Sequence, residues 1–140
     1  MREAAARDEP AILAFMRGLH ETEQDGEPAT DRALLRLLDR SEIFIAEDAS
    51  GPVGMLAVEI LDPPEDLGRR PYACLMALAV SPARRGAGVG SRLVERMRAF
   101  LRRAGIARVD LYVRASNAQA LAFYRKQGFC VETLAMRAQV

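Results

Sequence analysis

Several features that often decide a protein's class are scarce in this chain of 140 residues. It has no tryptophan, one histidine and two cysteines. The cysteines, Cys74 and Cys130, lie in separate apolar runs, and neither has a partner at metal-ligand or redox-motif spacing. We therefore expect two buried, reduced thiols, no disulfide framework and no metal site.

Long apolar runs and an excess of one charge are also absent. No run approaches the roughly 20 apolar residues that a membrane-spanning helix needs. Glu3, Asp8 and Glu9 interrupt the amino terminus before a signal-peptide-like stretch develops. Lys and Arg number 20 against 19 Asp and Glu, a formal net charge of +1. This balance argues against general nucleic-acid binding, and the pattern as a whole predicts a cytoplasmic protein without a membrane segment.

What is present suits a small globular protein. Half of the residues are hydrophobic and 28% are charged, which is enough for a hydrophobic core and a solvated surface. The length fits a single domain, which we place at residues 1–140. The composition is also compatible with a homodimer.

Hydrophobic periodicity and turn residues predict a mixed α/β fold. Asp8 is placed to cap a first helix and Thr30 a second. Asp48 to Gly51 form a hairpin turn, so the strands on either side pair antiparallel, whereas the crossover helix after Gly88 needs parallel neighbours. Helices are expected near 9–21, 31–38, 88–104 and 117–127, and strands near 43–46, 53–61, 72–80, 109–113 and 129–136.

A glycine-rich turn joins the strand ending at Val80 to the long helix. It contains three alternating glycines, Gly86, Gly88 and Gly90. Glycines let the backbone turn tightly and remove Cβ atoms that would block a ligand. The N–H groups and the dipole of the helix start form an anion site suited to phosphate, where Arg84 or Arg85 can add charge-assisted contacts. The alternative is a turn that serves only tight packing of strand and helix.

Two other phosphate-binding motifs fit this turn less well. A P-loop needs Gly-Lys-Ser/Thr at its end, and the turn has no lysine. A dinucleotide-binding turn needs a third glycine where Ser91 stands. Asp110 lies about 20 residues further on, as that motif requires, but inside a predicted strand rather than at its carboxyl end. The dinucleotide interpretation is therefore disfavoured.

The segment Arg85-Gly86-Ala87-Gly88-Val89-Gly90 resembles the Arg/Gln-x-x-Gly-x-Gly/Ala signature of the GNAT superfamily of acyl-CoA N-acyltransferases. The resemblance implies a mixed central sheet with a splayed strand pair, flanked by helices on both faces. It also implies acetyl-CoA as cosubstrate, with its pyrophosphate held by backbone N–H groups of Arg85, Gly86, Ala87, Gly88, Val89, Gly90 and Ser91.

A second motif follows one strand later. Asn117 is a good helix N-cap, and Ala120 and Tyr124 are spaced to share one helix face. By itself this pattern also suits a core tyrosine with a satisfied hydroxyl. The stretch from Asn117 to Phe129 looks like the carboxyl-terminal GNAT motif, Asn-x-x-Ala-x-x-x-Tyr-x-x-x-Gly-Phe. Two motifs in the right order carry more weight than either one.

The resemblance implies roles for particular residues. Backbone groups of Leu78 and Val80, in the segment Leu78-Ala79-Val80, would pair with the pantetheine amides. A nearby backbone N–H would polarise the thioester carbonyl. Asn117 would contact the cofactor, and Tyr124 would protonate the departing thiolate as general acid.

The general base is the point where the sequence departs from the family. Many relatives carry a carboxylate two or so residues ahead of the Leu-x-Val, and here Met76 and Ala77 stand there. Glu59, on the preceding strand and partly desolvated by apolar neighbours, is the first candidate. His20 is its rival because its unperturbed pKa suits the task, and water or a residue of the acidic loop is the remaining alternative.

The acceptor is expected to be a primary amine of a small molecule or peptide. In the family it contacts the first two helices and a loop between strands, here Leu19 to Asp31 and Asp62 to Pro71. Both stretches are acidic on balance, which suits a cationic acceptor as well as an ordinary solvated loop. A non-catalytic acetyl-CoA-binding module is the alternative function.

Overall fold

The computed structural model describes residues 1–22 and 30–140. In this part of the chain one sheet holds five strands in sequence order, β1 (Arg2–Glu3), β2 (Ser41–Asp48), β3 (Gly51–Leu61), β4 (Tyr72–Val80) and β5 (Val109–Leu111). Neighbouring strands from β1 to β4 are antiparallel, and β5 runs parallel to β4. The helices are α1 (Glu9–Thr22), α2 (Asp31–Leu37), α3 (Val89–Arg103) and α4 (Ala118–Lys126).

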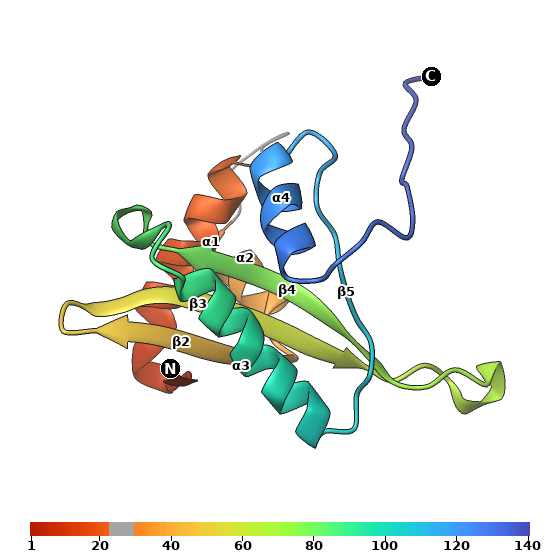
Figure 1. Cartoon of the computed structure of the whole chain (residues 1–140), viewed down its shortest axis with the longest axis horizontal. Coiled ribbons are helices and arrows are strands. Elements are labelled where there is room, and N and C mark those ends of the chain that lie inside the picture. Colours follow the sequence, from red (N-terminus) through yellow and green to blue (C-terminus); the bar gives the residue numbers. More distant parts are fainter. Residues whose placement is uncertain (23–29) are drawn as a thin grey trace.

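The helices cover both faces of this sheet, as Figure 1 shows. On one face of the sheet, α3 packs against a core that continues to α4. The largest fully buried side chains of this core include Phe44, Leu56, Leu93, Val94 and Met97. On the other face α1 and α2 cover a second core built from Ile12, Met16, Leu34, Ile45 and Met55, among others. The predicted fold class, a mixed sheet flanked by helices on both faces, is therefore confirmed.

The hairpin between β2 and β3 forms where its turn residues predict it. The Asp48 carboxylate accepts from the Ser50 backbone N–H at 2.8 Å and from the Ser50 hydroxyl at 2.5 Å. Gly51 has a φ of 107°, a conformation that favours glycine. The Ser50 hydroxyl, followed by Arg84 and the Ser50 backbone N–H, lowers the pKa of Asp48 to about 2. The hairpin turn thus sets which residues of β2 and β3 face each other, and it positions β3 against α3.

Three predicted helices match the structure closely. Thr30 caps α2, since its hydroxyl accepts from the Ala33 N–H at 3.2 Å. Gly105, with a φ of 74°, follows the end of α3 as expected. Asn117 caps α4 through a bond from the Ala120 N–H at 3.1 Å. Side-chain caps of this kind satisfy N–H groups that the helix itself leaves unpaired.

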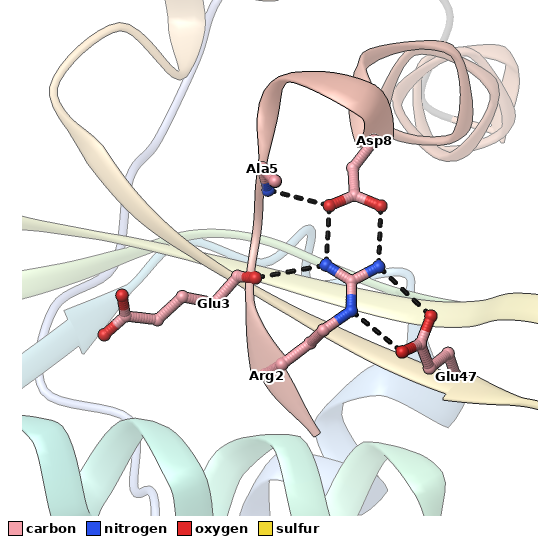
Figure 2. A network of polar contacts seen from close by, with 5 residues as sticks. All are labelled: Arg2, Glu3, Ala5, Asp8 and Glu47. Carbon is pink, nitrogen blue, oxygen red and sulfur yellow. Dashed lines mark hydrogen bonds and ion pairs between the residues drawn. The ribbon is translucent and has the colours of Figure 1, made fainter.

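Asp8 has a different task from the predicted cap of α1. Figure 2 shows its carboxylate facing the Arg2 guanidinium, which donates to both carboxylate oxygens at 2.7 and 2.9 Å. The Ala5 N–H donates to the same carboxylate at 2.7 Å, and Arg2 also binds Glu47 on β2. Arg2, followed by the Ala5 N–H, holds the pKa of the buried Asp8 well below its ordinary value. This network ties β1 and the entry of α1 to β2.

The carboxyl-terminal prediction is wrong. Residues 129–136 form no strand; they are extended and leave α4 and the sheet, as Figure 1 shows. Cys130 is accordingly exposed, whereas the buried position expected for Cys74 is confirmed. The segment is largely apolar, but within the described chain it pairs with no strand. The strand predicted at 109–113 is also shorter, ending at Leu111.

No helix among the described residues is both long enough and apolar enough to cross a lipid bilayer.

Candidate active site

At one edge of the sheet, the strands β4 and β5 part about a third of the way along β4. They pair only at Ala73, Cys74 and Leu75, while β4 continues to Val80. On its other side β4 stays paired with β3 along its whole length, except for one irregularity. The opening beyond Leu75 is called the fork here, and it is the splayed pair that the family resemblance implied.

The irregularity is a bulge at Met76. Ala57 of β3 faces Ala77, but the next residue, Val58, faces Leu75, so Met76 has no counterpart. A bulge of this kind bends a strand and shifts its side chains to the other face. Ala73 and Leu75 contact the α3 core, and after the bulge Leu78 and Val80 do so instead. The side chain of Ala77 is buried in the α1/α2 core. The bulge therefore sits where the fork opens.

The backbone of β4 beyond the bulge presents polar groups to the fork. The Ser81 N–H donates to the Val53 carbonyl at 2.8 Å, so these two residues form a hydrogen-bonded pair. In an antiparallel ladder, hydrogen-bonded pairs alternate with pairs that are not hydrogen-bonded. By that alternation the N–H and C=O groups of Leu78 and Val80 face away from β3. No strand of the described residues lies on that side. The segment from Leu78 to Val80 is thus an open strand edge of the kind that pairs with an extended, amide-bearing ligand.

The glycine turn follows directly at the end of this edge. After a short 3₁₀ turn, η3 (Pro82–Arg84), Gly86 and Gly88 both have a φ of 81°. A Cβ on either glycine would meet no atom within 4 Å, so the space above the turn is open. Neither N–H makes a hydrogen bond to the described residues, whereas those of Arg85 and Ala87 bond within the turn. With the free N–H groups of the first turn of α3, these groups form an anion-binding arrangement.

Gly90 is a glycine for another reason. A Cβ there would lie 3.2 Å from the Phe123 ring of α4. The close approach of the two helices is supported by Gln127, whose side chain donates to the Ser91 hydroxyl at 2.9 Å. Arg98 of α3 also donates to the Gln127 carbonyl. The packing explanation for a glycine in this turn therefore holds at Gly90 and not at Gly86 or Gly88.

The two arginines of the turn are not equivalent. Arg84 pairs with Asp48 at 2.8 Å, which ties the turn to the β2–β3 hairpin. Its guanidinium is therefore already engaged in an ion pair. Arg85 is exposed and has no partner among the described residues. Only Arg85 is unoccupied and adjacent to the open N–H groups.

Tyr124 lies on α4 at the edge of the α3 core. It is half-buried, and its ring makes edge-to-face contacts with Phe123 at 5.3 Å and with Phe129 at 5.7 Å between centroids. Asn117 is exposed, at the other end of α4, and its Oδ1 accepts the capping bond. The Tyr124 ring is thus packed against aromatic neighbours, on the helix α4 that lies against the glycine turn.

Glu59 stands further from the turn, at the closed end of the fork. It lies opposite Cys74, whereas Gly54 lies opposite Val80, which separates Glu59 from the turn by roughly 17 Å along β3. Glu59 shares the α1/α2 face with Met55 and Ala57, as the alternation predicted. The side chain is half-buried and has no ion pair among the described residues.

Polar side chains line up with Glu59 across four strands. Strand register places Ser41, Glu59, Cys74 and Asp110 in one row. The Ser41 hydroxyl is buried and has no hydrogen-bond partner in the described structure. Burial, followed by the charges of Asp110 and Glu59, raises the pKa of the Cys74 thiol. Asp110 is neutralised by Arg108 at 2.6 Å, so Glu59 is the unpaired carboxylate of the row.

Part of the predicted acceptor-binding region lies outside the described residues. Residues 23–29 belong to the acidic stretch between α1 and α2, and they lie outside the described residues. His20 lies in the last two turns of α1. The second acidic stretch, residues 62–71, contains the one-turn helix Glu65–Leu67 and is mostly exposed.

Comparison with known sequences agrees with the two motifs. The profile of the acetyltransferase (GNAT) family matches residues 9–129. A mycothiol acetyltransferase of Saccharomonospora viridis is 38% identical over 104 residues, which are 72% of this chain and 34% of that protein. An uncharacterised N-acetyltransferase of Methanocaldococcus jannaschii is 29% identical over 91 residues, covering 65% of this chain and 40% of that protein. The chain spans about a third of the length of the mycothiol acetyltransferases it matches.

Solved structures show the same fold. A mutant form of the BH1408 protein of Bacillus halodurans superposes with a TM-score of 0.87 at 19% identity, covering 99% of this chain and 98% of that one. An aminoglycoside acetyltransferase from a soil metagenomic sample, in complex with sisomicin, gives a TM-score of 0.74 at 21% identity, covering 99% and 93%. Since the family profile covers most of the sequence, the chain belongs to the acetyltransferase (GNAT) family.

Proposed function

We propose that this chain is an N-acetyltransferase that moves an acetyl group from acetyl-CoA to a primary amine of a small molecule or peptide. The observation that carries the proposal is the fork with the glycine turn at its end. An open strand edge at Leu78 and Val80 leads directly to unbonded N–H groups at Gly86 and Gly88. This arrangement offers amide pairing and then an anion site, the order in which pantetheine and pyrophosphate occur in coenzyme A.

The residues present fit the phosphate end of that ligand. Gly86 and Gly88 leave the space above the turn open, and the start of α3 adds its dipole. Arg85 is exposed and unpaired among the described residues, so it is available to a phosphate. Asn117 lies at the start of α4 and would contact the cofactor from the opposite side.

In the proposed reaction the amine nitrogen attacks the thioester carbonyl carbon, the C–N bond forms and the C–S bond breaks. A backbone N–H of the β4 edge polarises the carbonyl oxygen. Tyr124 gives a proton to the departing thiolate, and a base accepts the proton that the amine loses. Both proton transfers use groups of this chain, and no other co-reactant is needed.

Glu59 is the proposed base, acting directly or through one water. It is the unpaired carboxylate next to the closed end of the fork, on the α1/α2 face. Glu59→Gln should lower the rate most at low pH, where few amine molecules are neutral, and less at high pH. The measurement is the ratio of mutant to wild-type rates across pH. A ratio that stays constant with pH would remove Glu59 from the mechanism.

The alternative, an acetyl-CoA-binding module without catalysis, is favoured by one observation. The strand position that carries a carboxylate in many relatives is occupied here by Met76 at the bulge and by the buried Ala77. The names of the relatives refer to acetyl transfer, but these relatives are much longer, so the acceptor stays open.

One experiment separates these functions. Thiol release from acetyl-CoA is followed with a panel of amines, and each product is checked by mass spectrometry. We expect amine-dependent release and an acetylated product. Thermal stabilisation by acetyl-CoA without turnover on any amine would favour the binding module. Stabilisation by NAD but not by acetyl-CoA would contradict both.

A further inference from the structure

Two exposed apolar side chains stand where the fork opens. The last residue pair that joins β4 to β5 is Leu75 with Leu111. The next residue along each strand is Met76 on β4 and Tyr112 after β5, exposed at 37% and 92%. Single exposed apolar residues are ordinary on a protein surface. Two that stand on opposite walls of one opening form a patch, which is called the fork pair here.

Both members of the fork pair belong to the face of the sheet that α1 and α2 partly cover. Side chains alternate between the two faces along an extended strand. Leu75 and Leu111 contact the α3 core, so the residues that follow them point to the other face. The bulge places Ala77 on that face as well, buried in the α1/α2 core. The exposed Met76 therefore lies at the border of the helix cover, and the fork pair is reached from the side opposite α3.

The charges around the fork pair limit what it can bind. Asp110, the neighbour of Tyr112 on the same face, accepts hydrogen bonds from Arg108 at 3.0 and 2.6 Å. The Arg108 guanidinium also lies 4.5 Å from the centre of the Tyr72 ring. The two opposite charges are thus paired with each other, and Glu59, in the same row as Asp110, is the carboxylate left unpaired among the described residues. Such a surface suits a ligand with one ammonium group and an uncharged, apolar remainder.

We propose that the acceptor is a primary amine that carries an aromatic ring, and that this ring binds between Met76 and Tyr112. The inference rests on the proposed function and names the class of acceptor for that site. Stacked aromatic rings gain more than their buried area provides, and a methionine sulfur makes a favourable contact at a ring edge. A second ammonium group in the same place would be repelled by Arg108, which lies close to Tyr112.

The spacing along β4 limits the size of this acceptor. Leu78, where the open strand edge begins, is two residues beyond Met76, at most ~7 Å along an extended strand. In the proposed reaction a backbone N–H of this edge polarises the thioester carbonyl that the amine attacks. A ring joined to the nitrogen by about two carbon atoms spans this distance. The probe is therefore 2-phenylethylamine. Ethylamine lacks the ring, and 1,4-diaminobutane has a second charge in its place.

The first test compares kcat/KM for these three amines at saturating acetyl-CoA. The wild type should prefer 2-phenylethylamine over each of the others by at least ~10-fold. Tyr112→Ala and Met76→Ala should lower kcat/KM for 2-phenylethylamine, by about 10-fold and about 3-fold, and leave that for ethylamine unchanged. Ile60→Ala is the matched control, because Ile60 is 38% exposed but follows Val58 on the α3 face of β3, and it should change neither value.

Three results of the first test would overturn the inference. They are a wild type that uses all three amines equally, a preference for 1,4-diaminobutane, and an equal loss for 2-phenylethylamine and ethylamine in the fork-pair variants.

The second test measures binding without turnover. The chain has no tryptophan, so Tyr112→Trp introduces a single fluorescent reporter and keeps an aromatic ring at this position. With desulfo-coenzyme A bound, 2-phenylethylamine should change the fluorescence saturably and ethylamine should not. Adding Met76→Ala should weaken this binding by about 3-fold. Tyr72→Trp, before the residues that pair with β5, is the control and should not respond. No saturable change, or the same change in the control, would contradict a ring site at the fork pair.

The two tests distinguish this inference from the proposed function. Saturable binding of 2-phenylethylamine without turnover of any amine would leave the ring site standing and contradict the N-acetyltransferase. Turnover of ethylamine or 1,4-diaminobutane at least as fast as that of 2-phenylethylamine would leave the N-acetyltransferase standing and contradict the ring site.

Discussion

The two edges of the sheet are built in opposite ways. The β1 edge is two residues long, and Arg2 binds Asp8 and Glu47 there, so these charged side chains are paired within the chain. The β5 edge is also short, but it parts from β4 after three pairs and has no strand outside it in the described structure. Short, charged strands are a common way to block unwanted pairing at an edge.

The two edges therefore differ in what they contribute to the protein. The β1 edge is completed by charges that the chain itself provides, and none of these groups lies near the fork. The β5 side leaves polar groups unpaired on both of its borders, toward β4 and toward solvent. Changes at the β1 edge should therefore affect stability and leave turnover intact. Changes on the β5 side should affect ligand binding or turnover and leave stability nearly intact.

The largest expected effect is on the β5 side. Tyr124→Phe keeps the ring contacts with Phe123 and Phe129 and removes only the hydroxyl. If Tyr124 is the general acid, kcat should fall by roughly 10²- to 10⁴-fold while acetyl-CoA affinity holds. Steady-state rates and thermal shift by acetyl-CoA measure the two quantities.

Tyr72→Phe is the control for that change, because Tyr72 starts β4, before the residues that pair with β5, and so lies outside the fork. An unchanged kcat for Tyr124→Phe, in an assay where chemistry limits turnover, would make Tyr124 a packing residue only.

The next effect is on the β1 edge. Arg2→Leu leaves the Asp8 carboxylate buried without its guanidinium partner, and breaking a buried pair in this way is costly. Tm should fall by roughly 10 °C, and kcat measured well below Tm should be unchanged. Arg7→Leu removes the same charge from an exposed neighbour and should have little effect. Adding Asp8→Leu to Arg2→Leu should restore much of the loss; failure to do so would mean that Arg2 acts through Glu47 instead.

The same network predicts an acid dependence. Arg2 and the Ala5 N–H lower the pKa of Asp8 in the folded state, so its stabilisation is complete above the ordinary Asp pKa of about 3.9. It is lost as the pH falls through the folded pKa. The difference in Tm between the wild type and Arg2→Leu/Asp8→Leu should therefore shrink below about pH 4. Asp48 titrates alike in both proteins and cancels, whereas Glu47, whose pKa Arg2 also lowers, adds to the same acid dependence. A difference that stays constant down to the acid transition would show that neither carboxylate of this network contributes a pH dependence.

Local chemistry made much of the molecule predictable from sequence. The hairpin turn, the caps at Thr30 and Asn117 and the left-handed glycines depend on residues close in sequence, so their patterns are visible there. The long alternating strands and the stripe of α3 are likewise local periodicities. The positions of the glycine turn and of α4 followed from these elements.

Features set by distant partners were not predictable. Asp8 was expected to cap α1, but its partner Arg2 and the shared Glu47 come together only through the β1–β2 pairing. The bulge at Met76 has no sequence signal because β4 is apolar on both faces, so a shift of face leaves the pattern unchanged. The segment 129–136 suits a strand by its apolar composition, but a strand also needs an edge to pair with, which composition does not specify.

The smallest expected effect separates the two arginines beside the fork. Arg85→Ala should weaken acetyl-CoA binding about tenfold, because a charge-assisted contact to phosphate is lost. The remaining affinity should also depend less on salt. Arg84→Ala breaks an exposed ion pair with Asp48, and such pairs contribute little to stability. It should lower Tm slightly and leave affinity almost unchanged, whereas Asp48→Ala should lower Tm more, because it also removes the two Ser50 hydrogen bonds of the hairpin turn. A larger loss of affinity for Arg84→Ala than for Arg85→Ala would place the phosphate one residue earlier in the turn, on the hairpin side, and the β2–β3 hairpin would then belong to the binding site as well.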